Sequence, residues 1–162
     1  MISKTRSDYI SNRAWFRDIL ANQDVILCHV SALECLELFD GYVNEKTIDV
    51  YARERGIYEN INYRVVDTFD GIEIVSIGNL RCTSFSQTLN DMFKEFDTTD
   101  MQALVEALGE YYHTNNMSFD GIVISSENIE RFNHIKDWAI EYFDEGGYSY
   151  DTPRKTYVSY TG

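Results

Sequence analysis

The sequence is poor in proline, cysteine and basic residues, with one, three and 14 of these in 162 residues. No apolar run approaches the roughly 20 residues that a membrane-spanning helix needs, so we expect no membrane partner. The few cysteines, odd in number, predict reduced thiols, and the polar start of the chain lacks the apolar core of a secretory signal. Together these features predict a cytoplasmic protein.

Low-complexity segments are also missing, and 44% of the residues are apolar. A chain of this length and composition can bury a sizeable core, so we expect one domain over residues 1–162. Residues 1–10 are polar, and we expect them to be flexible. Residues 148–162 form a tyrosine-rich tail, in which 156–160 is either an edge strand or a mobile terminus.

Positive charge is scarce, because the chain has 27 acidic but only 14 basic residues, which gives a formal net charge of −13. A protein that binds DNA or RNA directly needs a basic surface, so direct nucleic-acid binding is disfavoured. The acidity is concentrated in residues 91–145, which hold 13 acidic and 3 basic residues, a net charge of −10. This part of the chain is expected either to keep the protein soluble or to attract a basic protein partner.

Hydrophobic periodicity and capping residues predict the secondary structure. Helices are expected over residues 12–21, 31–39, 85–96, 101–112 and 126–145. Their starts are assigned to a Ser31–Glu34 capping box, to Ser84 with Gln87, to Thr99 with Gln102, and to Ser125 or Ser126. Strands are expected over residues 47–52, 61–69 and 72–77, with the apolar run 25–27 before the second helix. Residues 121–124 are either a short strand or an extended link.

Asp70-Gly71 is a typical hairpin turn and joins two of these predicted strands. The order of helices, then strands, then helices favours an α+β fold over a doubly wound α/β fold. We therefore predict a small, mostly antiparallel sheet of three to five strands, flanked by about five helices.

Catalytic and metal-binding patterns are weak. Cys28, His29 and Cys35 are metal-ligand types, but their spacing matches no closed zinc site and a fourth ligand is missing nearby. Asp70 and Glu73 resemble part of a nuclease pattern, but Val75 occupies the position of its lysine. We predict a protein that is not an enzyme and uses no metal or cofactor.

The candidate partner-binding residues are acidic and aromatic side chains of the last three predicted helices and their starts. They are Asp97, Asp100, Glu106, Glu110, Tyr111, Tyr112, Glu130, Asp137 and Glu141. For any one carboxylate a solvated helix face is the simpler explanation, so the functional interpretation concerns their combined field. In the predicted helix 126–145, the pattern directs Ile129, Phe132, Ile135, Trp138 and Ala139 inward, together with Tyr142 and Phe143.

Two stretches carry a family resemblance. The segment His-Val-Ser-Ala-Leu-Glu at 29–34 is similar to a helix start in AbiEi-type antitoxins. Residues 77–93, with Arg-Cys-Thr followed by Thr-Leu-Asn-Asp, resemble a later block of the same family. The similarity spans roughly residues 24–115. It implies the C-terminal, antitoxic part of that family, whose toxins resemble nucleotidyltransferases.

Family members begin with a winged helix-turn-helix, whereas only about two dozen residues precede the matching block here. We therefore expect no DNA-binding role. The archetypal antitoxin of the family need not touch its toxin, so direct binding is a separate hypothesis. The sequence favours an antitoxin-like, protein-binding module of a bacterial or phage defence system. The alternative is a nucleic-acid-mimicking inhibitor of a nuclease, such as an anti-CRISPR or anti-restriction protein.

Overall fold

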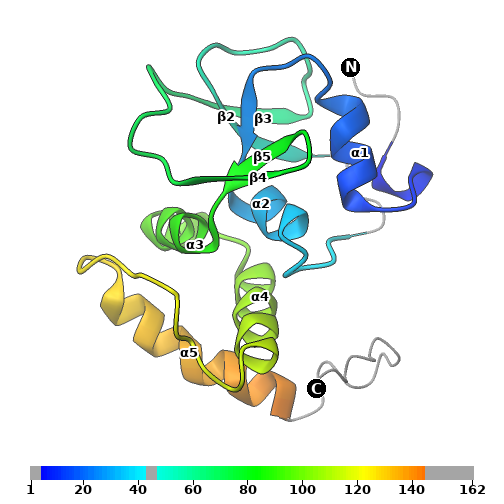
Figure 1. Cartoon of the computed structure of the whole chain (residues 1–162). Helices are drawn as coiled ribbons and strands as arrows, with labels where there is room; N and C mark the ends of the chain where they lie inside the picture. Colours follow the sequence, from blue (N-terminus) through cyan, green and yellow to red (C-terminus); the bar gives the residue numbers. More distant parts are fainter. Residues whose placement is uncertain (1–4, 43–46, 145–162) are drawn as a thin grey trace.

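A computed structural model describes residues 5–42 and 47–144, which form five α-helices and a five-stranded sheet, with the last two helices lying away from the sheet (Figure 1). The α+β prediction is confirmed. The predicted strand 156–160 and the tyrosine-rich tail lie outside the described residues. Within the first ten residues, Arg6–Asp8 forms a 3-10 turn, and the Tyr9 hydroxyl donates a hydrogen bond to Asp18.

The sheet is mixed rather than mostly antiparallel, so that part of the prediction is wrong. Its strands are β1 (Val25–Leu27), β2 (Ile48–Ala52), β3 (Ile61–Val65), β4 (Ile74–Ile77) and β5 (Leu80–Thr83), in the order β3-β2-β1-β5-β4. The pairs β1–β5 and β2–β3 are parallel, whereas β1–β2 and β4–β5 are antiparallel. The loop 53–60 returns the chain to the same end of the sheet, so β3 runs parallel to β2.

The predicted hairpin at Asp70-Gly71 is also wrong, because β3 and β4 lie at opposite edges of the sheet. Asp70-Gly71 instead lies in the connection that carries the chain from one edge to the other. The two-residue hairpin turn is Gly78-Asn79, between the paired residues Ile77 and Leu80. Gly78 has a φ of 61°, a left-handed conformation that glycine adopts at little cost.

The helices are α1 (Asn12–Ile19), α2 (His29–Cys35), α3 (Phe85–Lys94), α4 (Met101–Thr114) and α5 (Ile129–Asp144). The Ser84 cap is confirmed, since its hydroxyl accepts the Gln87 amide at 3.1 Å. Asp100, rather than Thr99, caps α4 by accepting the Ala103 amide. Residues 121–124 form a link without a strand, and α5 begins later than Ser125 or Ser126.

The predicted capping box at Ser31 is wrong because α2 begins two residues earlier, at His29. Ser31 is fully buried within the helix, and its hydroxyl accepts the Asp49 amide of β2 at 2.9 Å. The residue therefore fastens α2 to the sheet instead of opening the helix.

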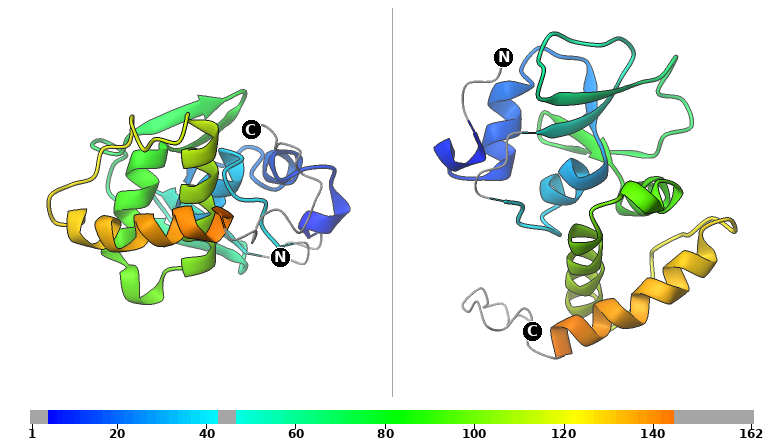
Figure 2. Two further views of the ribbon diagram at one scale, coloured as in Figure 1. Left: turned by 90° about the horizontal axis from the view of Figure 1, so that it is seen from below. Right: turned by 180° about the vertical axis from the view of Figure 1, so that it is seen from behind.

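Two apolar clusters make up the core. We call residues 5–83 the sheet lobe and residues 84–144 the helical lobe. In the sheet lobe, Trp15 and Phe16 of α1 pack with the apolar side chains of β1, β2 and β5. In the helical lobe, α3, α4 and α5 enclose the second cluster, and α5 forms the outermost layer (Figures 1 and 2). Helix α2 bridges the lobes, because Ala32 belongs to the first cluster and Leu33 to the second.

Candidate functional site

Three of the predicted carboxylates share the outer face of α5. Successive residues of an α-helix are rotated by about 100°, so Glu130, Asp137 and Glu141 fall within a narrow sector that also contains His134. All four side chains are exposed. The opposite face carries Phe132, Ile135 and Ala139, which are buried against the rest of the helical lobe. Packing of this apolar face therefore turns the three carboxylates toward solvent.

The acidic residues before and within α4 are placed differently. Asp97 is exposed in the short turn before the helix. Asp100 caps α4 and also accepts a hydrogen bond from the Tyr42 hydroxyl at 2.9 Å. Glu106 accepts a hydrogen bond from Gln102 of the same helix, and both Glu106 and Glu110 are half-buried. Asp100, Glu106 and Glu110 are therefore less available to a partner than the carboxylates of α5, whereas Asp97 is open to solvent.

The two predicted tyrosines are engaged within the helical lobe. The Tyr111 hydroxyl donates to the backbone carbonyl of Asp120, and its ring lies 5.1 Å from the ring of Phe85. The Tyr112 ring lies 4.9 Å from that of Phe119. Both side chains are half-buried, so much of their surface holds the connection after α4 in place.

Trp138 is one of two residues of α5 that the sequence misplaced. The predicted inward position is wrong, because 49% of its surface is exposed. Ile129, also predicted inward, is 43% exposed. Trp138 lies about 90° around the helix from the centre of the buried face and joins the sector that holds the three carboxylates. An amphipathic pattern does not locate such a boundary residue, since the width of the buried face depends on the neighbouring helices.

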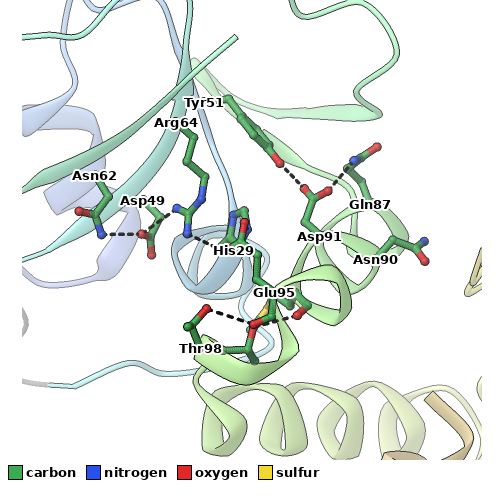
Figure 3. A network of polar contacts seen from close by, with 12 residues as sticks. His29, Asp49, Tyr51, Asn62, Arg64, Gln87, Asn90, Asp91, Glu95 and Thr98 are labelled. Atoms are coloured by element: carbon green, nitrogen blue, oxygen red, sulfur yellow. Dashed lines mark hydrogen bonds and ion pairs between the residues drawn. The ribbon is translucent and has the colours of Figure 1, made fainter. Parts of the chain in front are cut away.

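A second polar assembly, which the sequence did not reveal, joins the two lobes (Figure 3). Its centre is His29, at the start of α2, whose side chain is almost completely buried and whose Nε2 lies 3.2 Å from Oε2 of Glu95. The backbone of His29 has a φ of 53°, a left-handed conformation that costs a non-glycine residue about 1–3 kcal/mol. This conformation presents the imidazole to the end of α3.

Arg64 of β3 extends the same assembly. Its guanidinium donates to Asp49 of β2 at 3.2 Å and to Glu95 just beyond α3 at 3.1 Å. Beside it, the Tyr51 hydroxyl donates to Asp91 of α3 at 2.9 Å. We call His29, Asp49, Arg64 and Glu95 the lobe joint. Its charges of opposite sign come from both lobes, an arrangement suited to holding them in one orientation.

Burial and neighbouring charges shift the pKa values of two residues of the lobe joint, His29 and Glu95. Burial of the ring, and then the neighbouring Arg64 guanidinium, lower the pKa of His29 and outweigh the attraction of Glu95. Burial by itself would raise the pKa of Glu95, but the hydrogen bond from Arg64 and the charges of His29 and Arg64 outweigh it and lower that pKa. Both directions keep the imidazole neutral and the carboxylate charged near neutral pH.

We expect this histidine to make stability depend on pH. Its pKa is lower in the folded protein than the unfolded value of about 6.5, so the unfolded chain binds more protons as the pH falls below that value. The free energy of unfolding should therefore decrease from pH 7 toward pH 5. Urea unfolding at both values should show a smaller decrease for His29→Gln. The exposed His134 supplies the control, since His134→Gln should retain the wild-type pH dependence of the free energy of unfolding. If this pH dependence decreased equally in both variants, the assignment to His29 would be contradicted.

The cysteines lie apart from any ligand cluster. All three are buried and free, and burial raises the pKa of the Cys28 thiol. Within residues 5–42 and 47–144, no three His, Cys, Asp or Glu side chains are grouped so as to hold a metal ion. His29 instead directs one ring nitrogen to Glu95.

Comparison with protein-family models finds no model that matches the chain, and comparison with curated proteins finds no match. None of the helices formed by residues 5–42 and 47–144 has both the length and the apolar character needed to cross a membrane. The geometry itself thus offers two features for a functional argument: the outer face of α5 and the lobe joint.

Proposed function

We propose that this chain is an antitoxin-like, protein-binding module that neutralises the toxin of a bacterial or phage defence system. The observation that carries the proposal is the outer face of α5. Glu130, Asp137 and Glu141 are exposed there, and none of them forms an ion pair with any of the described residues. Unpaired carboxylates on one face attract and orient a basic partner.

The family resemblance supports the same proposal. Its first block, residues 29–34, lies in α2, and its second block, residues 77–93, covers the β4–β5 turn, β5 and most of α3. Leu33 and Leu89, one from each block, share the core of the helical lobe. The two stretches therefore contribute to the same apolar cluster.

The test begins with growth. The gene adjacent to this one is expressed alone and then together with this protein; we expect growth arrest in the first case and recovery in the second. Growth arrest that this protein does not relieve, or a harmless neighbouring gene, would refute the antitoxin proposal.

The surface is tested by reversing its charge. Replacing Glu130, Asp137 and Glu141 together with lysine should reduce the number of protected colonies at least about tenfold, because three attractive contacts become repulsive. The matched control reverses the three exposed carboxylates Glu59, Asp67 and Asp70 of the sheet lobe, and it should protect like wild type. Circular dichroism checks that both variants fold. Full protection by the folded α5 variant would exclude this face.

The helical lobe also suits the second candidate, a nucleic-acid-mimicking nuclease inhibitor. Residues 84–144 contain 12 acidic and 3 basic residues, a net charge of −9. Inhibition by mimicry should weaken as salt increases and should be overcome by added DNA or guide RNA. Salt-insensitive inhibition that nucleic acid does not relieve would contradict it.

A further inference from the structure

The exposure of Trp138 to water is energetically unfavourable, because tryptophan has a large and mostly apolar side chain. The other tryptophan, Trp15, is completely buried in the sheet lobe, whereas 49% of the surface of Trp138 is accessible. Tryptophan is among the residues that most often dominate the binding energy of protein interfaces. Helix α5, which carries Trp138, is the outermost helix of the helical lobe (Figure 2), so a partner can reach the exposed part of the indole.

The surroundings of Trp138 define the charge of that partner. His134 and Glu141 lie one turn away on either side along α5, and Asp137 is adjacent. The two basic residues of α5 are directed elsewhere. Arg131 donates to the backbone carbonyl of Phe93 and lies over the Phe96 ring, and Lys136 lies over the Phe132 ring. Among the described residues of α5, the sector around the indole therefore carries the carboxylates Glu130, Asp137 and Glu141 and neither Arg131 nor Lys136.

We propose that the outer face of α5 binds an arginine-bearing segment of a protein partner, with Trp138 as the central apolar anchor. An arginine guanidinium can stack on the indole face while the flanking carboxylates accept its hydrogen bonds, and an apolar partner residue covers the rest of the ring. Identification of this partner as the toxin rests on the proposed function. The binding chemistry of the face is independent of that function.

The first experiment uses a defined probe and the full chain. The probe is a fluorescently labelled, amphipathic helical peptide of arginine and leucine, and a glutamate–leucine peptide of the same length is the control. We expect binding of the arginine peptide only. Because Trp15 is buried, acrylamide quenching of the intrinsic fluorescence reports mainly on Trp138, and unlabelled arginine peptide should reduce it.

Matched variants then locate the site. Trp138→Ala should raise the Kd for the labelled peptide at least about tenfold, as for an interface hot spot. Val123→Ala removes another exposed apolar side chain, outside α5, and should leave the Kd unchanged. Asp137→Lys should weaken binding more than Glu59→Lys, which makes the same charge change in the sheet lobe. Circular dichroism confirms folding of each variant.

Equal peptide affinities for Trp138→Ala and Val123→Ala would overturn the proposal. So would protection of Trp138 that rises with protein concentration in the absence of peptide, because a second copy would then be the occupant. In the growth assay, Trp138→Ala should lose protection. A harmless neighbouring gene would refute the antitoxin function alone, and the peptide measurements would still decide the binding face.

Discussion

Replacing Arg64 with alanine should lower the free energy of unfolding by about 2–3 kcal/mol. The guanidinium binds Asp49 of the sheet lobe and Glu95 of the helical lobe, and its loss leaves both carboxylates without this cation. Asp49 has only 17% of its side chain exposed, so water compensates poorly for the missing partner. Glu95 is 43% exposed and is better solvated, which keeps the effect below that of a fully buried pair.

Urea unfolding followed by circular dichroism measures this difference. Arg55→Ala is the control, since Arg55 is an exposed arginine of the same lobe and should change stability by less than about 0.5 kcal/mol. The Arg64 charge also helps to keep His29 neutral, so in Arg64→Ala the pKa of His29 should rise. A loss of stability below about 1 kcal/mol would mean that the joint does not hold the lobes together.

Replacing Asn90 with alanine should cost about 2–3 kcal/mol and should loosen α5 more than the rest of the molecule. The Asn90 amide donates to the carbonyls of Ser86 and Val123, and its oxygen accepts hydrogen bonds from Ser125 and Asn128. These contacts fix the link between α4 and α5 onto α3. Asn128, just before α5, has 2% of its surface exposed and would lose a buried partner.

Amide hydrogen exchange shows which part of the molecule loses stability in Asn90→Ala. In Asn90→Ala, amides of residues 129–141 should exchange faster, whereas those of β1 and β2 should keep their protection. Asn62→Ala supplies the control, because Asn62 is an exposed asparagine with one side-chain hydrogen bond, to Asp49. Uniformly faster exchange in Asn90→Ala would indicate global destabilisation and contradict a local role for this asparagine.

Much of the secondary structure followed from local chemistry. The Ser84 cap and the amphipathic pattern of 101–112 predicted two helices within a few residues, because both signals depend on neighbours one turn apart. Strand pairing did not follow in the same way. Asp70-Gly71 has the residues of a tight turn, yet Gly78-Asn79 closes the hairpin, and only contacts with distant strands distinguish the two.

The candidate sites show the same difference between local signals and contacts that form only on folding. The sequence identified the acidic residues of the last helix, since they are visible as composition and helical spacing. It did not identify the lobe joint, whose members His29, Asp49, Arg64 and Glu95 are spread over 67 positions of the chain and meet only after folding. Nor did it place Trp138, because the width of the face that α5 buries is set by the helices packed against it.

The sequence by itself thus determined the acidity of the helical region, the α+β class and the position of most helices, all of which depend on composition or on contacts within a few residues. The tertiary structure decided the parallel strand pairs, the use of Ser31 and Arg64 to fasten elements together, and the exposure of Trp138. Each of these depends on which distant segments pack together, and that choice reflects the burial of the whole chain rather than any local pattern.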